Sequence, residues 1–322
     1  METVWLDLFY WVLINVLMVL LGYVFIQRSL MLQSWLMLII SILIIHLIFL
    51  HQHPILRMLA LIATTFTAMK VIAVAESYKG KSLTLTFKQW LTFACGWAGM
   101  RAQPFETLGA ARLPNAWPMI RFGISRIIAG LLLILLAHEL VLLPLDHTLL
   151  YILISTVLLI ALSLILHFGL LSISAGMWRL SGVNTYPLFK QPLKSKSLTE
   201  LWGKRWNIAF IEMTTITIFR PLKHKIGAGA ALLLSFAFSG LLHELALSVP
   251  VNSGYGLPML YFIVQGVLVL IEKALADKKI VFLQNKVTAK IWTLFWIVAP
   301  APLLFHAQFI KEIVWPLVGV HL

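Results

Sequence analysis

His243 stands at the end of a regular row of small residues. Counting back from it in steps of four gives Ser239, Ser235, Ala231 and Gly227, which share one face of a helix. An imidazole exchanges protons near neutral pH, so a substrate that reached His243 would meet an acid–base group. The row has two interpretations. It allows close helix packing in a membrane, or it forms a groove that leads a chain-like substrate to the imidazole. Taken alone, the row favours packing.

Two neighbours of His243 extend this pattern. Gly240, three residues earlier, widens the row of small side chains. Glu244 follows directly, but adjacent residues of a helix point about 100° apart. A simple His–Glu dyad is therefore not indicated.

A second constellation is the run WGKRWN at residues 202–207. Trp202 and Trp206 are four residues apart and share a helix face, with Lys204 and Arg205 directed elsewhere. Such a run is typical of an interfacial anchor, with the indoles at the level of the headgroups and the cations among the lipid phosphates.

More cations follow in the run FRPLKHK at 219–225, which contains Arg220, Lys223 and Lys225. Such a cluster could also hold a polyanionic soluble cofactor on the cytoplasmic face. There is no Walker loop, and GAGAAL at 227–232 lacks the third glycine and the preceding strand of a dinucleotide fingerprint.

The composition indicates where these residues must lie. Of 322 residues, 61% are hydrophobic and 11% are charged, with a mean hydropathy of +0.94. A soluble domain is about half apolar and about a quarter charged, so this chain is expected to be a multi-pass membrane protein. The low charged fraction excludes a nucleic-acid-binding module despite the net charge of +13. The single cysteine, Cys95, excludes an internal disulfide framework and a multi-thiolate metal site.

Eight stretches are long and apolar enough to cross a bilayer, which takes about 20 residues each. They lie at about 4–26, 30–50, 55–75, 122–143, 148–170, 226–248, 257–275 and 291–309. The sequence therefore predicts an all-α integral membrane protein, a single multi-pass domain over residues 1–322 with its motif-bearing core at about 195–275.

The basic residues predict the orientation of these spans. Of the 25 Lys and Arg, 22 fall beside the spans on one side, while Arg57 and Lys311 fall on the other. Cytoplasmic segments carry the excess of Lys and Arg, so both termini are expected on the non-cytoplasmic side. Lys70 lies inside a span, close enough to its inner end to extend its ammonium group toward the interface.

Two expected cytoplasmic segments, 79–121 and 172–225, are rich in tryptophan and proline and contain apolar runs too short to cross, such as 89–98. These features fit interfacial or re-entrant helices. Irregular backbone at membrane depth requires cover by protein or water, so the two segments are expected to line a central cavity.

Other ionisable residues within the spans have a simpler explanation. His46, His138, Glu139 and His306 fall near outer ends, and His167 falls near an inner end. Side chains at these levels can reach the interface, so none is taken as a catalytic group.

The order and spacing of two motifs resemble the membrane-bound O-acyltransferases, and most closely their wax-synthase-like branch. The first is WGKRWN at 202–207 and the second is SGLLHE at 239–244, within a hydrophobic helix. Leu201 replaces the usual Phe and Lys204 the first Arg of the branch. GWAGMRAQPF at 96–105 resembles a weaker upstream element of the same branch.

The resemblance implies acyl transfer from a coenzyme A thioester to a hydroxyl group within the membrane. The family's catalytic histidine maps onto His243 and its other motif residue onto Asn207. His243 would act as general base, and Asn207 would orient the thioester or stabilise the oxyanion. Coenzyme A is then expected beside Trp202, Trp206 and the cations, which are Lys204, Arg205, Arg220, Lys223 and Lys225. Ser235, Ser239, Gly240 and Glu244 are expected to line the substrate tunnel.

The acceptor is expected to be a long-chain alcohol or another lipid hydroxyl, because branches with Glu after the histidine act on lipids. A sterol, diacylglycerol or glycan acceptor is the alternative, and a non-catalytic transport or lipid-handling protein is the third. Acyl-CoA would be a substrate, with no permanently bound cofactor and no metal. The partners are membrane lipids, with no nucleic acid and the oligomeric state open. A bacterial cytoplasmic membrane is favoured over the endoplasmic reticulum.

Overall fold

The fold is helical throughout the part of the chain that the computed structural model describes, residues 2–278 and 285–320. Eight helices there are long and apolar enough to span a membrane, which agrees with the eight predicted spans. The protein is an all-α, multi-pass integral membrane protein. The spans are Val4–Gln27, Met31–Ile48, Pro54–Ser77, Ala116–Val141, His147–Leu180, Ala228–Ser248, Leu257–Asp277 and Lys286–Leu304.

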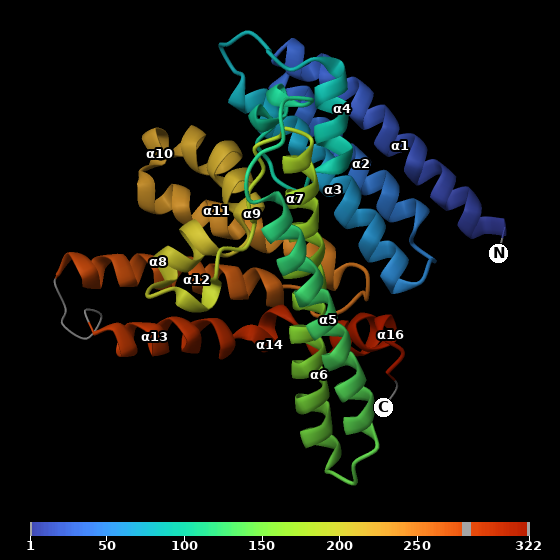
Figure 1. The fold of residues 1–322 in the computed structure, drawn as a ribbon, viewed down its shortest axis with the longest axis vertical. Helices are drawn as coiled ribbons and strands as arrows, with labels where there is room; N and C mark the ends of the chain where they lie inside the picture. Colours follow the sequence, from blue (N-terminus) through green and yellow to red (C-terminus); the bar gives the residue numbers. More distant parts are fainter. Residues whose placement is uncertain (1, 279–284, 321–322) are drawn as a thin grey trace.

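The N-terminal half contains seven α-helices and two short helices of other kinds. They are α1 (Glu2–Gln27), α2 (Met31–Ile48), α3 (Pro54–Ser77), α4 (Phe87–Gly96), the 3-10 helix η1 (Gln103–Thr107), α5 (Ala116–Val141), α6 (His147–Ser163), the π-helix η2 (Leu164–Leu170) and α7 (Leu171–Leu180). The hairpin of α5 with α6 extends away from the other helices (Figure 1). Gly123 allows close packing within this unit, because a Cβ there would lie 2.6 Å from the carbonyl oxygen of Gly169.

The second half contains the segments that build the site. They are η3 (Pro192–Lys194), α8 (Leu198–Glu200), η4 (Leu201–Arg205), α9 (Ile208–Thr214), η5 (Thr215–Phe219), α10 (Arg220–Ile226), α11 (Ala228–His243), η6 (Glu244–Ser248) and α12 (Leu257–Asp277). The chain continues with α13 (Lys286–Val298), α14 (Ala301–Leu304), α15 (Ala307–Phe309), η8 (Ile310–Val314) and α16 (Trp315–Leu317). Helices α11 and α12 pack along each other.

The fifth span continues ten residues beyond its expected end at 170. The π-helix Leu164–Leu170 passes directly into α7, so one continuous helix runs from His147 to Leu180. His167 therefore lies inside the helix, where its ring stacks on Phe189 at 4.7 Å. The chain leaves the helix at Ser181 and Gly182, where glycine adopts a positive φ of 80°.

The short apolar run at 89–98 forms α4, but its tryptophan belongs to the protein core and not to the membrane interface. Thr86 and Gln89 form a capping box that begins the helix. Trp90 is fully buried and donates a hydrogen bond from its indole to the Val19 carbonyl at 2.8 Å. Trp97, which follows α4, is 1% exposed. The segment is covered by protein, as irregular backbone in a membrane requires.

Lys70 does not reach the interface, contrary to the prediction. Its side chain is buried, and its ammonium group donates hydrogen bonds to the carbonyl oxygens of Phe93 and Ala94, at 3.2 and 2.6 Å. These carbonyls belong to the last turn of α4, where a helix has acceptors without intrahelical partners and a partial negative charge. Lys70 thus binds α4 to α3.

Candidate active site

His243 is the last residue of α11 and lines a cavity of about 260 Å³. Its Nδ1 lies 2.7 Å from the carbonyl oxygen of Ser239. Because a carbonyl oxygen only accepts hydrogen bonds, Nδ1 carries a proton, and in the neutral imidazole Nε2 therefore keeps its lone pair. The ring of Phe262 packs against the imidazole at 4.3 Å, and that of Phe210 lies 5.1 Å away on another side. The imidazole is therefore held as a proton acceptor between two aromatic rings.

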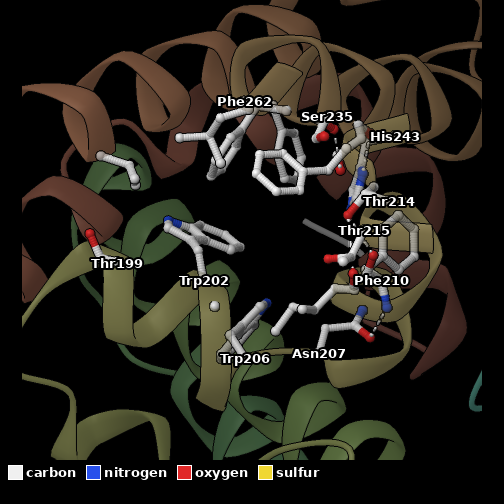
Figure 2. Close-up of a pocket in the computed structure, with 17 residues that line it drawn as sticks. Thr199, Trp202, Trp206, Asn207, Phe210, Thr214, Thr215, Ser235, His243 and Phe262 are labelled. Atoms are coloured by element: carbon white, nitrogen blue, oxygen red, sulfur yellow. Dashed lines mark hydrogen bonds between the residues drawn. The ribbon is translucent and has the colours of Figure 1, made fainter. Parts of the chain in front are cut away.

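Asn207 reaches the same cavity from the start of α9. It has a left-handed φ of 44°, which asparagine tolerates better than most residues, and its Oδ1 accepts a hydrogen bond from the Phe210 amide at 3.3 Å. No described residue accepts a hydrogen bond from its Nδ2. Asn207 and His243 lie along one wall of the cavity, with Phe210 and Thr214 between them (Figure 2). The cap thus holds the carboxamide with its donor group unpaired.

The row of small residues before His243 divides between the two interpretations. Ser235 and Ser239 line the cavity, and their hydroxyl groups donate to the carbonyls four residues earlier at 2.8 and 3.1 Å. These serines thus present little polarity to the cavity. Gly240 instead faces α12, because a Cβ there would lie 2.8 Å from the sulfur of Met259. Part of the row forms a groove and part of it packs helices.

Glu244 is directed away from the imidazole, as the helical angle requires. Its Oε1 accepts a hydrogen bond from the Met259 amide at 2.9 Å, near the start of α12. Neither Glu244 nor Gly240 is among the residues that line the cavity. The structure therefore places both beside α12 and brings Ser235 and Ser239 to the substrate space.

Aromatic and aliphatic side chains form most of the remaining wall. The Trp202 indole projects into the cavity from the side opposite His243 (Figure 2), and its Nε1 donates to Gln265 Oε1 at 3.0 Å. Gln265 is fully buried and donates to the Trp296 carbonyl at 2.7 Å, so the indole is fixed to α12 and α13. Trp206 lines the same cavity and packs against Phe189 at 5.2 Å. The sequence motifs did not identify Phe210 and Phe262.

A second cavity of about 600 Å³ adjoins the first, because Gly203 and Ile211 line both. We name it the basic vestibule for its four cationic lining residues. Lys190 and Lys204 are exposed, whereas Arg205 forms an ion pair with Glu200 at 2.6 Å and Arg101 forms one with Glu212 at 3.1 Å. Its lining residues are Arg101, Tyr186, Lys190, Glu200, Gly203, Lys204, Arg205, Ile208, Ile211 and Glu212.

Glu212 binds the upstream element at 96–105 to α9. Its carboxylate accepts hydrogen bonds from the Tyr186 hydroxyl at 2.5 Å and the Met100 amide at 3.3 Å, in addition to its ion pair with Arg101. Burial raises the pKa of the Glu212 carboxyl above its ordinary 4.5, while Tyr186 and Arg101 oppose that rise. Burial and the neighbouring Glu212 likewise raise the pKa of Tyr186. Glu212 and Tyr186 lie outside the sequence motifs.

The predicted donor-binding cations separate into two groups. Lys204 and Arg205 line the basic vestibule, where Arg101 and Lys190 join them. Arg220, Lys223 and Lys225 lie on α10 and line neither cavity.

Comparison with known proteins gives a match over the segment that carries these motifs. Residues 185–264, which carry Asn207 and His243, match the family described as "Membrane bound O-acyl transferase family". The segment that holds both motifs is thus similar to the membrane-bound O-acyltransferase family.

Two curated relatives indicate the wax-synthase-like part of this family. The chain is 26% identical over 144 residues to the long-chain-alcohol O-fatty-acyltransferase of Simmondsia chinensis. The aligned region covers 41% of this chain and 40% of that protein. It is 28% identical over 145 residues to the probable long-chain-alcohol O-fatty-acyltransferase 9 of Arabidopsis thaliana, which covers 41% and 42%. The matched region thus spans about two fifths of each relative. Both are plant proteins, and the expected bacterial membrane stays a prediction.

Proposed function

We propose that this membrane-bound O-acyltransferase moves a fatty acyl group from acyl-CoA to a long-chain alcohol and so forms a wax ester. The observation that carries the proposal is the pair of groups in one apolar cavity: an imidazole whose Nε2 lone pair is free and a carboxamide whose Nδ2 is unpaired. A proton acceptor and a hydrogen-bond donor are the two groups that attack of a hydroxyl on a thioester requires.

The reaction begins when His243 Nε2 takes the proton of the alcohol and the alcohol oxygen attacks the thioester carbonyl. Asn207 Nδ2 then donates a hydrogen bond to the oxyanion of the tetrahedral intermediate. When the intermediate collapses, the carbon–sulfur bond breaks and the thiolate of coenzyme A takes the proton from the His243 imidazolium. The products are an ester and a free thiol, and the imidazole returns to its starting state.

The two adjoining cavities suit the two parts of the donor. The acyl chain lies in the apolar cavity, along Ser235, Phe236 and Trp202, where burial contributes about 0.8 kcal/mol for each methylene. The phosphates of coenzyme A bind in the basic vestibule, where Lys190 and Lys204 are exposed and have no ion-pair partner among the described residues. Gly203 lines both cavities and adds no side chain at their junction.

The apolar lining and the names of the two relatives favour a long-chain alcohol as acceptor over a glycan. A sterol or diacylglycerol hydroxyl is the second candidate, because either would enter the same apolar space. A non-catalytic lipid carrier would have no use for the free Nε2 of His243 or the free carboxamide of Asn207.

The test is purified protein with radiolabelled palmitoyl-CoA and one acceptor at a time: hexadecanol, cholesterol, diacylglycerol or glucose. We expect labelled ester with hexadecanol and its loss in His243→Ala. Ester formation with another acceptor and none with hexadecanol would show that the proposed acceptor is wrong and that the proposed acyl transfer is right. A wild-type protein that produces neither ester nor free coenzyme A with any acceptor would refute acyl transfer.

A further inference from the structure

Helix α10 lies at the edge of the fold, in gold in Figure 1. It spans Arg220–Ile226, has no buried residue and packs mainly on η5 and α11, the two segments that it joins. Both of these line the cavity: Phe219 ends η5 directly before α10, and Leu232 belongs to the second turn of α11. The helix thus forms the corner between two walls of the candidate active site.

The charge on α10 has no counterpart in the described protein. Arg220, Lys223 and Lys225 form no ion pair or side-chain hydrogen bond with any described residue, in contrast to Arg101 and Arg205. They lie outside both cavities, so the phosphates of a donor bound in the basic vestibule would not neutralise them. These three cations within six residues form a concentrated positive surface that could bind a negatively charged ligand from outside the protein.

The position of α10 indicates that source. The next membrane span begins at Ala228, two residues after α10 ends, so the cations lie where the chain enters the bilayer. Ile226 is 45% exposed, and every residue from His224 to Ala230 is exposed as well. Arg220 and Lys225 are exposed and Lys223 is half-buried. Cations next to exposed apolar side chains at a membrane boundary fit anionic headgroups, with the aliphatic parts directed into the acyl region.

We propose that α10 binds the phosphate headgroups of anionic phospholipids through Arg220, Lys223 and Lys225. Bound lipid holds the corner between η5 and α11 against the membrane surface, and the cations of the basic vestibule remain available for other anions. The proposal does not depend on acyl transfer, because it concerns a surface outside both cavities.

The test places purified protein in phosphatidylcholine nanodiscs that contain a defined fraction of phosphatidylglycerol. It then measures how much phosphatidylglycerol stays bound to the protein. The variant is Arg220→Gln/Lys223→Gln/Lys225→Gln. Its matched control, Lys81→Gln/Lys88→Gln/Lys194→Gln, removes the same charge from exposed positions elsewhere. Each Lys or Arg near an anionic surface contributes about fivefold in affinity, so the α10 variant should lose at least about tenfold and the control little. Added salt should reduce wild-type binding toward that of the variant.

A single change separates binding from folding. Lys225 is exposed and forms no ion pair with a described residue, so Lys225→Gln should fold normally and retain less phosphatidylglycerol, while Lys225→Arg should retain the wild-type amount. Equal lipid retention by wild type and both triple variants would overturn the proposal. Displacement of phosphatidylglycerol by free coenzyme A in wild type, together with loss of coenzyme A binding in the α10 variant, would overturn it too and assign α10 to the donor.

Discussion

The ring of Phe210 lies 5.1 Å from the imidazole of His243, and the backbone amide of the same residue donates to the Asn207 side chain. One residue therefore touches both groups of the proposed catalytic pair. Phe210 belongs to the first turn of α9, whereas His243 ends α11, so the two motifs meet through this contact. The two motifs are separate in the sequence, but Asn207 and His243 lie along the same wall of one cavity.

This arrangement predicts that His243 and Asn207 act on one transition state. His243→Ala should reduce turnover by about 10²–10⁴-fold, because it removes the general base. Asn207→Ala should reduce it by about 10–10³-fold through loss of a donor to the oxyanion. The double variant should be barely slower than His243→Ala, since residues that act as a unit are not additive. Single-turnover rates with palmitoyl-CoA and hexadecanol measure all three.

His138→Ala is the matched control for these changes. His138 also precedes a glutamate within a span, but it lines neither cavity, and its Nε2 lies 2.9 Å from the Val318 carbonyl oxygen. It should keep most of the activity. If His138→Ala loses as much turnover as His243→Ala, or if His243→Ala keeps near-normal turnover, His243 is not the general base.

The groove along α11 predicts opposite effects for two substitutions of Ser239. Its hydroxyl group already donates to the Ser235 carbonyl, so Ser239→Ala should retain near-normal turnover. Ser239→Leu places a large side chain in the cavity next to His243 and should abolish turnover of long-chain substrates. Ala230→Leu, on an exposed position of the same helix, controls for helix packing. Full activity in Ser239→Leu would show that substrates do not pass along this face.

Hydropathy was sufficient to predict the eight spans, because the thickness of the bilayer dictates the length of each helix. It was insufficient at the inner end of the fifth span. The apolar stretch predicted an end near residue 170, yet a π-helical segment continues the helix to Leu180. The prediction that the Lys70 ammonium group reaches the interface was also wrong. The carbonyl oxygens that accept its hydrogen bonds belong to α4, a helix whose position relative to α3 the sequence does not reveal.

The motifs located the proposed catalytic pair, but they could not identify the residues that reach it from elsewhere. Phe262 comes from α12 and contacts His243 across a helix–helix interface with no sequence signal. Glu212 is recognisable as a buried charge once Arg101 and Tyr186 are seen around it. The sequence grouped the cations of 219–225 with Lys204 and Arg205, but α9 and η5 lie between the two groups along the chain, and only Lys204 and Arg205 line the basic vestibule.

The ion pair that holds η4 predicts a dependence of stability on pH. The amide of Lys196 and then Arg205 lower the pKa of the Glu200 carboxyl below its ordinary 4.5. A lowered pKa contributes stability above the ordinary value and loses it as pH falls through the lowered one. The wild-type thermal midpoint should therefore fall below about pH 4.5.

Glu200→Gln should lower the thermal midpoint at pH 7, because it removes the ion pair with Arg205. This pair is partly exposed, so its loss should reduce the free energy of unfolding by about 1 kcal/mol. It should also reduce the acid-dependent part of the midpoint change. Arg112→Gln, at an exposed position with no ion pair among the described residues, serves as the charge control. An identical acid profile in Glu200→Gln and wild type would exclude this carboxylate as a contributor.

The distribution of basic residues predicts opposite sides of the membrane for two exposed positions. In a Cys95→Ser background, Leu193→Cys should react with an impermeant thiol reagent from the cytoplasmic face and Tyr255→Cys from the other. Leu193 is 70% exposed and Tyr255 is 59% exposed, so both are accessible. Labelling of both from one face would contradict a single span between the two positions, and labelling of each from the face opposite to the expected one would reverse the orientation.

The basic vestibule predicts which cations the donor requires. Lys204→Gln should raise the KM for acyl-CoA more than it lowers kcat, because an exposed cation that binds phosphate contributes equally to the ground state and the transition state. Lys190→Gln should act in the same way, and the two changes together should raise KM further. Lys223→Gln, on α10 and outside both cavities, should leave the KM unchanged and is the matched control. If Lys223→Gln raises KM as strongly as Lys204→Gln, the donor extends to α10. If Lys204→Gln and Lys190→Gln leave KM unchanged, its phosphates do not bind in the vestibule.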